Sequence, residues 1–123
     1  MTTGKPAEPE YGFSAEIDHA IKTEFEKDDP YSKLSIVLQS AYGQAADGKG
    51  KARHNSRGVS FDRQPIMEIA RMCGLGYPTG QAQKKTQEAV SMFNRGEHER
   101  AEAELLGAIN YLAAAVLLIR EAK

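Results

Sequence analysis

The stretch LLGAINYLAAAVLLI at residues 105–119 decides the fold, because only Gly107, Asn110 and Tyr111 interrupt its run of aliphatic side chains. A helix with no polar face is expected to be enclosed by other protein. Acidic side chains precede this stretch and basic side chains follow it, which is the order that complements a helix dipole. We therefore predict one long helix over residues 97–122, buried in a small helical protein.

A membrane span is the other structure that such an apolar run could form. The run is shorter than the ~20 apolar residues needed to cross a bilayer, and Asn110 lies near its middle. A buried helix without membrane association is therefore favoured. A chain of 123 residues has little material to enclose this helix, because small domains bury a small fraction of their surface. We expect a homo-oligomer to complete its burial.

Composition favours one domain in a reducing compartment. The formal net charge is -1, which gives no general attraction to nucleic acid, so stable nucleic-acid binding is not expected. Cys73 is the only cysteine, so no internal disulfide can form. The first ten residues are polar and contain prolines, without a signal-peptide or lipidation pattern. We expect a cytoplasmic protein.

The rest of the sequence predicts an all-α bundle of about five helices. Residues 1–12 are expected to be a flexible tail, and residues 13–123 a single helical domain. The turn at residues 94–96 makes the last two helices an antiparallel hairpin. The predicted helices begin at Ser14, after Asp29-Pro30 and ending near Gly48, at Pro65, near Thr79, and at Glu97.

Apolar residues at helical spacing predict which side of each helix faces inward, and none of them forms a heptad run. The predicted inward residues are Leu34, Val37, Leu38, Ala41 and Ala45 of the second helix, Ile66, Ile69, Ala70 and Cys73 of the third, and Ala82, Thr86, Ala89, Val90 and Phe93 of the fourth.

A basic, glycine-rich loop at residues 47–64 has neither helical nor strand periodicity, and no acid lies between Asp47 and Asp62. Long loops without structure are usually functional or disordered. Together with the start of the fourth helix, this loop supplies cations, helix N-terminal amides and aromatic rings for an anionic ligand such as a nucleotide. The alternative is a solvated loop paired with the acidic first helix. The candidate ligand-binding residues are Arg53, His54, Asn55, Arg57, Phe61, Tyr77, Thr79, Gln81, Lys84 and Lys85.

Motifs for other chemistry are incomplete. The glycines at residues 74–80 lack the Gly-Lys-Ser/Thr of a phosphate loop and the strand that precedes it. His19, His54 and His98 do not have the spacing of a metal site. Cys73 is expected to be a packed thiol rather than a nucleophile. We therefore predict no catalytic residue, no metal and no cofactor.

Carboxylates near the helical hairpin permit one enzymatic alternative. Helical MazG-type nucleoside-triphosphate pyrophosphatases hold magnesium with carboxylates on neighbouring helices. That family pairs Glu-Glu-x-x-Glu with a later Glu-x-x-Asp, whereas here Glu88 stands alone and no aspartate follows it. A surface ladder of charges explains these acids equally well. The acids concerned are Glu88, Glu97, Glu99, Glu102 and Glu104.

Three segments resemble small proteins of tailed phages: RH at 53–54, FDRQPI at 61–66, and EAELLGAINYL at 102–112. The closing hairpin is also similar to that of the phage cyclic-nucleotide sponges that blunt CBASS and Thoeris immune signalling. Their second helix carries Leu-x-x-Ala-x-x-Trp-Ala-x-Ala-x-Ile, which Leu105, Ala108, Tyr111 and Ala114 partly match, without the tryptophan.

The resemblance implies an oligomer that binds a phosphorylated signal at its subunit boundaries, in the host cytoplasm. The leading hypothesis is thus a phage-type anti-defence protein that sequesters a small nucleotide signal without catalysis. Two alternatives stay open: a protein-binding inhibitor of a host factor, and a MazG-like pyrophosphatase.

Overall fold

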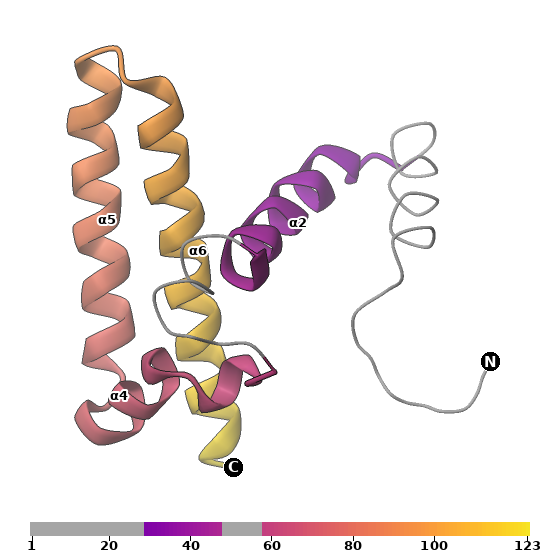
Figure 1. Ribbon diagram of the computed structural model, residues 1–123, viewed down its shortest axis with the longest axis vertical. Helices are drawn as coiled ribbons and strands as arrows, with labels where there is room; N and C mark the ends of the chain where they lie inside the picture. Colours follow the sequence, from indigo (N-terminus) through magenta and orange to yellow (C-terminus); the bar gives the residue numbers. More distant parts are fainter. Residues whose placement is uncertain (1–28, 48–57) are drawn as a thin grey trace. The chain divides into compact units, whose positions relative to one another are not determined.

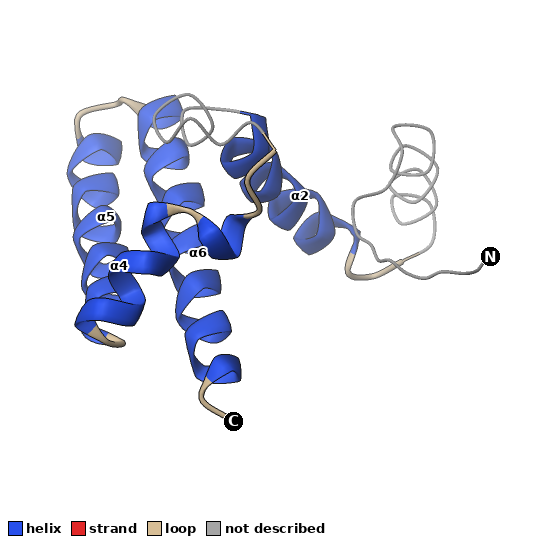
Figure 2. Ribbon diagram, turned by 60° about the horizontal axis from the view of Figure 1, so that its bottom comes forward, coloured by secondary structure: helices blue, strands red, loops and turns tan. Residues whose placement is uncertain are grey.

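The computed structural model describes residues 29–47 and 58–123, and the regular structure in these residues is all helical (Figures 1 and 2). This confirms the predicted all-α class. The chain divides into two units, Met1–Val37 and Leu38–Lys123, and each is taken by itself. The elements in chain order are α2 (Ser32–Asp47), the short 3-10 helix η1 (Phe61–Arg63), α4 (Pro65–Cys73), α5 (Gly76–Asn94) and α6 (His98–Glu121).

Several predictions fall on residues that are not described. The tail at 1–12, the helix predicted from Ser14 and most of the basic loop lie outside the described residues. The described part holds four of the roughly five predicted helices.

Helix α2 begins where the sequence predicts, after Asp29-Pro30. The Tyr31 backbone N–H donates to Asp29 Oδ1 at 2.8 Å, so the aspartate side chain caps the start of the helix. Within the first unit, the predicted inward positions Leu34 and Val37 are exposed.

The part of α2 in the second unit contacts α6 through small and polar groups. Ala41 is buried, and its carbonyl accepts a hydrogen bond from Asn110 Nδ2 at 3.0 Å. Gln44 Nε2 donates to the Ala103 carbonyl at 3.1 Å. Of the other predicted inward positions in this part, Ala45 is half-buried and Leu38 is exposed.

Helix α4 begins at Pro65, as predicted, because proline is favoured in the first turn. Its buried residues are Met67 and Ala70. The prediction of an inward Cys73 is wrong: this residue ends the helix and is exposed. Gly74 follows it with φ of 86°, a conformation that favours glycine and stops the helix.

Helix α5 starts at Gly76, three residues before the predicted start at Thr79. Pro78 is buried inside its first turn, where a missing N–H breaks no helical hydrogen bond. The helix ends at Asn94, and Gly96 turns the chain with φ of 80°. Figure 1 shows α5 and α6 side by side and antiparallel, which confirms the predicted hairpin.

Small residues form the contact between α5 and α6. Ala82 and Ala89 of α5 are buried, as predicted, and Ala101, Ala108 and Ala115 of α6 are buried too. Small side chains at a helix contact allow the two backbones to approach closely. The fully buried residues of α5 are Pro78, Ala82 and Ala89.

Three residues predicted to face inward on α5 are exposed instead. Thr86 and Val90 lie outside the positions that face α6. Phe93 is exposed at the last turn, where its ring stacks on His98 with centroids 4.8 Å apart. Alanines occupy the contact, so these larger side chains remain outside it.

Helix α6 matches the predicted bounds closely and contacts α5, α4 and the second-unit part of α2, but one side of it stays open. Its fully buried residues are alanines and a glycine, whereas Leu105, Leu112, Val116 and Ile119 are 45–49% exposed. The expected enclosure therefore applies to the small residues, is partial for Leu106, Leu117 and Leu118, and is wrong for the four exposed residues. Among the described residues, α6 is the one helix long and apolar enough to cross a membrane, a test that core helices of soluble proteins also pass.

Candidate functional site

A polar cluster lies between α5 and α6, inside the hairpin. Tyr77 and Tyr111 meet edge to face, with ring centroids 5.9 Å apart. Lys85 Nζ lies 5.9 Å from the centroid of Tyr111 and 3.4 Å from Glu104 Oε1. The carbon chain of Lys85 crosses Gly107, where a Cβ atom would lie 3.1 Å from Lys85 Cδ. Two predicted ligand-binding residues, Tyr77 and Lys85, therefore make contacts within the protein itself.

Tyr77 is the most strongly perturbed titratable group of this cluster. Burial, and then the hydrogen bond to Tyr111, raise the pKa of Tyr77 to about 12. Its ring packs against Tyr111 rather than standing free to stack on a base. The cluster is a structural part of the hairpin.

The other candidates on α5 do not converge on one point. Thr79 lies within the helix, where its N–H and its hydroxyl both donate to the Leu75 carbonyl. The predicted free amides at Thr79 are therefore wrong, because the helix begins earlier. Gln81 is half-buried, and Lys84 is exposed with Nζ 3.6 Å from Glu88 Oε2.

The basic-loop half of the predicted ligand site is largely beyond what the structure describes. Arg53, His54, Asn55 and Arg57 lie outside the described residues. Phe61 is described, and it is the half-buried first residue of η1. The predicted ligand site therefore stays a prediction.

Three carboxylates of the hairpin, those of Glu88, Glu97 and Glu104, are paired with basic side chains. Besides the pairs of Glu88 and Glu104, Glu97 accepts from Arg95 at 3.0 Å and from Arg100 at 2.8 Å. The hydrogen bond from Arg95 lowers the pKa of Glu97. In residues 29–47 and 58–123, no three side chains among His, Cys, Asp and Glu form a group that could hold a metal ion.

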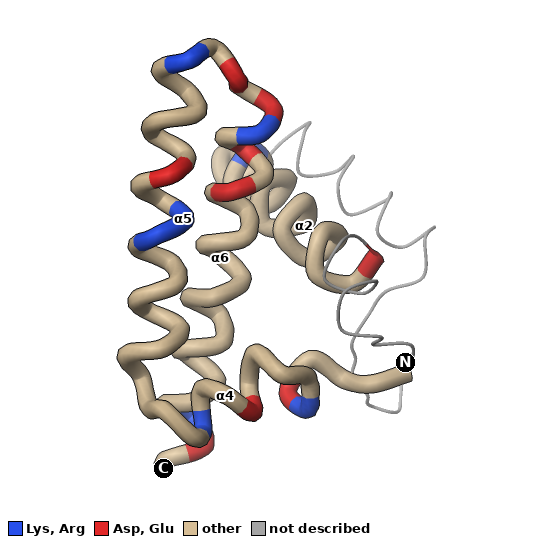
Figure 3. The backbone as a smooth tube through the Cα atoms, turned by 60° about the vertical axis from the view of Figure 1, so that its left-hand side comes forward, with Lys and Arg blue, Asp and Glu red and all other residues tan. Residues whose placement is uncertain are grey.

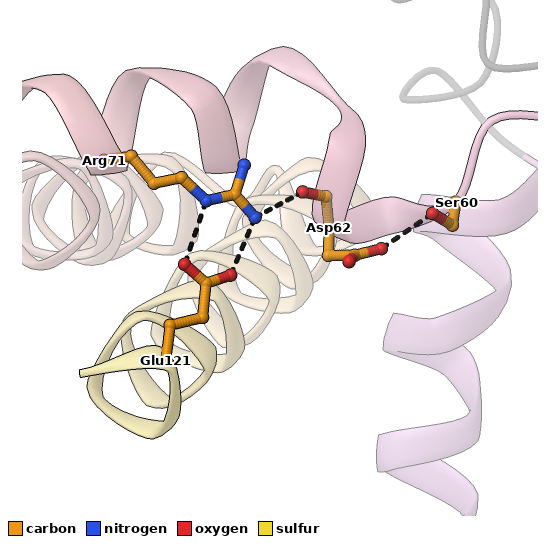
Figure 4. Close-up of polar contacts among 4 residues, drawn as sticks. All are labelled: Ser60, Asp62, Arg71 and Glu121. Carbon is orange, nitrogen blue, oxygen red and sulfur yellow. Dashed lines mark hydrogen bonds and ion pairs between the residues drawn. The ribbon is translucent and has the colours of Figure 1, made fainter. Parts of the chain in front are cut away.

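An arginine clasp joins the end of α4 to the end of α6 (Figure 4). Arg71 donates from Nε to Glu121 Oε1 at 2.9 Å and from Nη2 to Oε2 at 2.7 Å. The same Nη2 donates to the Asp62 carbonyl at 2.6 Å, and Ser60 Oγ donates to Asp62 Oδ1 at 2.6 Å. These bonds lower the pKa of Glu121, through Arg71, and of Asp62, through Ser60. The clasp neutralises the acid at the end of α6.

A second apolar surface runs along α6, beside the contact with α5. Its residues recur at spacings of four, three, four and three, and we call them the α6 stripe. The charged residues of α6 lie only at its two ends (Figure 3). Sequence reasoning missed the stripe because the whole run is apolar, although this spacing was available in the sequence. The α6 stripe consists of Leu105, Ile109, Leu112, Val116 and Ile119.

Comparison with protein-family models, with curated proteins and with solved structures finds no match for this chain. The resemblance to phage proteins therefore stays a prediction, and function has to be argued from the described residues.

Proposed function

We propose that this protein is a non-enzymatic binding protein that acts by packing the α6 stripe against another protein surface. The observation that carries the proposal is the exposure of its large side chains: Leu105, Leu112, Val116 and Ile119 each keep almost half of their surface open. Exposed apolar residues scattered singly are ordinary, but contiguous ones mark interaction sites. Fifteen helical residues extend the stripe over roughly 21 Å.

The other contacts of α6 support the proposal that the α6 stripe binds a partner. Its alanines are buried against α5, and Asn110 is bonded to α2, so two sides of the helix are in use. The clasp fixes the end of α6, which leaves the stripe on a rigid element. Large aliphatic side chains on such an element contribute binding free energy when a partner removes them from water.

Affinity capture with matched variants tests the proposal. Leu112→Glu places a charge in the centre of the stripe, whereas Met72→Glu places the same charge on α4 at a residue that is 82% exposed. We expect wild type and Met72→Glu to retain the same protein partner, including untagged copies of this chain, and Leu112→Glu to lose it. Identical retention by all three chains would contradict the proposal.

Sequestration of a phosphorylated nucleotide signal, as a phage-type anti-defence protein, is the second candidate. Lys84 supports it, because this side chain is 66% exposed and its pairing with Glu88 is long, at 3.6 Å. Surface ion pairs of this kind contribute at most ~1 kcal/mol, so a phosphate can compete for the lysine.

Calorimetry against cyclic di- and trinucleotides and ADP-ribose derivatives tests this candidate. We expect binding heat that falls in Arg53→Ala and Lys84→Ala. A wild-type chain that gives no heat at micromolar concentration would remove the candidate.

A further inference from the structure

The α6 stripe has the residue pattern of a two-stranded helix contact. Its alternating spacings of four and three residues keep one seam facing a partner helix. Ile109 and Val116 occupy one heptad position, and Leu105, Leu112 and Ile119 occupy the other. Aliphatic side chains at both positions of such a seam can insert between the side chains of a facing helix.

The two ends of α6 carry opposite charge. At its start, Glu97 and Glu104 are already paired with basic residues, which leaves Glu99 and Glu102 without an ion pair among the described residues. A helix partner with basic side chains at this end would neutralise them.

At the other end of α6 the situation is reversed. Glu121 is held by the Arg71 clasp, which leaves the cations Arg120 and Lys123 without an ion pair among the described residues. The chain therefore offers, at the two ends of one stripe, two acids and two bases that complement each other.

We infer that a second copy of this chain docks on the α6 stripe, with the two α6 helices antiparallel and related by a two-fold axis. The inference rests on the proposed function and names its partner. An antiparallel pair brings the acidic start of each helix beside the basic end of the other, and it opposes the helix dipoles. A parallel pair would place acids against acids and bases against bases.

The spacing also sets the alignment of the two helices. Leu105 then packs beside Val116 of the partner subunit, and Ile109 beside Leu112 of the partner subunit. Because the contact is isologous, each pairing occurs twice. The stripe is short, so the dimer is expected to dissociate on dilution.

Sedimentation velocity over a range of protein concentrations tests the dimer. We expect wild type and Met72→Glu to share one dimerisation midpoint, and Leu112→Glu to raise the midpoint concentration at least tenfold. Circular dichroism is expected to show the same helix content in all three, because Leu112 is half exposed within the monomer. A folded wild-type chain that stays monomeric at every concentration overturns the inference.

Disulfide formation between two different variants tests the orientation. Leu105→Cys and Val116→Cys are made separately in a Cys73→Ser background, mixed in equal amounts and oxidised. An antiparallel dimer is expected to give mostly the mixed disulfide, which intact mass spectrometry separates from the two symmetric ones. Mostly symmetric disulfides would overturn the antiparallel arrangement.

Failure of the inference and failure of the proposed function are distinguishable. A monomeric wild-type chain that retains another protein through the stripe would overturn the dimer and leave the proposed function in place. A monomeric wild-type chain that instead floats with phosphatidylcholine vesicles, and loses this property in Leu112→Glu, would assign the stripe to lipid and overturn both.

Discussion

The two apolar sides of α6 differ in the size of their residues. The side that contacts α5 carries Ala101, Ala108 and Ala115, which are buried within the chain. The neighbouring side is the α6 stripe of leucine, isoleucine and valine. Its residues at 105, 112, 116 and 119 are about half exposed. Four of the large apolar residues of α6 are therefore left open by the described fold, whereas its small residues are buried.

This difference separates two tasks of one helix. Alanines contribute little burial each, but they let α5 and α6 pack closely and fix the hairpin with a short turn. Large aliphatic residues contribute more free energy per side chain when they are buried, and here that contribution is left for a contact with another molecule. Close packing of small residues fixes the geometry of the hairpin, and burial of the α6 stripe supplies the binding free energy for a partner protein.

Enlarging one alanine of the α5 contact should have the largest effect on stability. We expect Ala108→Leu to lower the free energy of unfolding by about 2 kcal/mol, because an overpacked contact forces helices apart or side chains out of their rotamers. Urea denaturation followed by circular dichroism measures the change. Ala113→Leu, at an exposed position of the same helix, is the control and should change stability little. Equal behaviour of the two variants would show that the alanines do not set the helix spacing.

Helix positions were predictable from the sequence, whereas their inward faces were predictable only in part, as at Ala82 and Ala89. Pro65 at the start of α4 and the turn at residues 94–96 are local signals that depend on backbone chemistry alone. Which face of α5 is buried depends on its partner, and a contact made by alanines gives no hydrophobic contrast to detect. Val90 and Phe93 share the helical spacing that predicts an inward side, but both are exposed outside the contact.

Removing the clasp between Arg71 and Glu121 should weaken the contact between α4 and α6. We expect Arg71→Ala to lower the thermal midpoint by less than Ala108→Leu does, and Arg71→Lys to recover only part of the loss, because lysine cannot donate the paired hydrogen bonds that Glu121 accepts. Differential scanning calorimetry measures both, with the exposed Arg63→Ala as control. Full recovery by lysine would show that charge alone holds the clasp.

The clasp also predicts a dependence on acid. The hydrogen bonds from Arg71 lower the pKa of Glu121, so the carboxylate binds its proton less readily in the folded chain. Its stabilising contribution is therefore complete above the ordinary glutamate pKa of 4.5 and is lost as pH falls through the lowered value. Arg71→Ala should lack this part of the acid destabilisation.

Tyr77 gives a smaller effect at the opposite end of the pH scale. Its pKa is raised from 10.0 to about 12 in the folded chain, so its contribution is complete below pH 10 and is lost as pH rises through about 12. We expect Tyr77→Phe, which keeps the ring against Tyr111, to remove this alkaline loss. Unfolding free energy measured from pH 9 to 12 tests it, with the exposed Tyr42→Phe as control. If Tyr77→Phe left the pH dependence of the unfolding free energy unchanged, the raised pKa of Tyr77 would be contradicted.

The candidate ligand site was less predictable than the fold. Sequence reasoning grouped Tyr77, Lys84 and Lys85 by nearness along the chain, but neighbours on a helix point in different directions. Lys85 turns inward to Glu104, whereas Lys84 lies on the outer side with Glu88. The cations of the basic loop stay a prediction, since four of the ten predicted residues lie outside the described part of the chain.

Gly107 offers the finest test of how closely the hairpin is packed. Replacing glycine by alanine within a helix gains up to ~1 kcal/mol of intrinsic propensity, and Gly80→Ala, with open space around it, should show this gain. At Gly107 the new methyl group would lie 3.1 Å from Lys85 Cδ and 3.3 Å from Cε, so the lysine must move away from Glu104. We expect Gly107→Ala to gain only a few tenths of a kcal/mol in urea denaturation. An equal gain in stability at both glycines would mean that Lys85 is not held between the helices. It would also mean that the contact between α5 and α6 does not require a glycine at position 107.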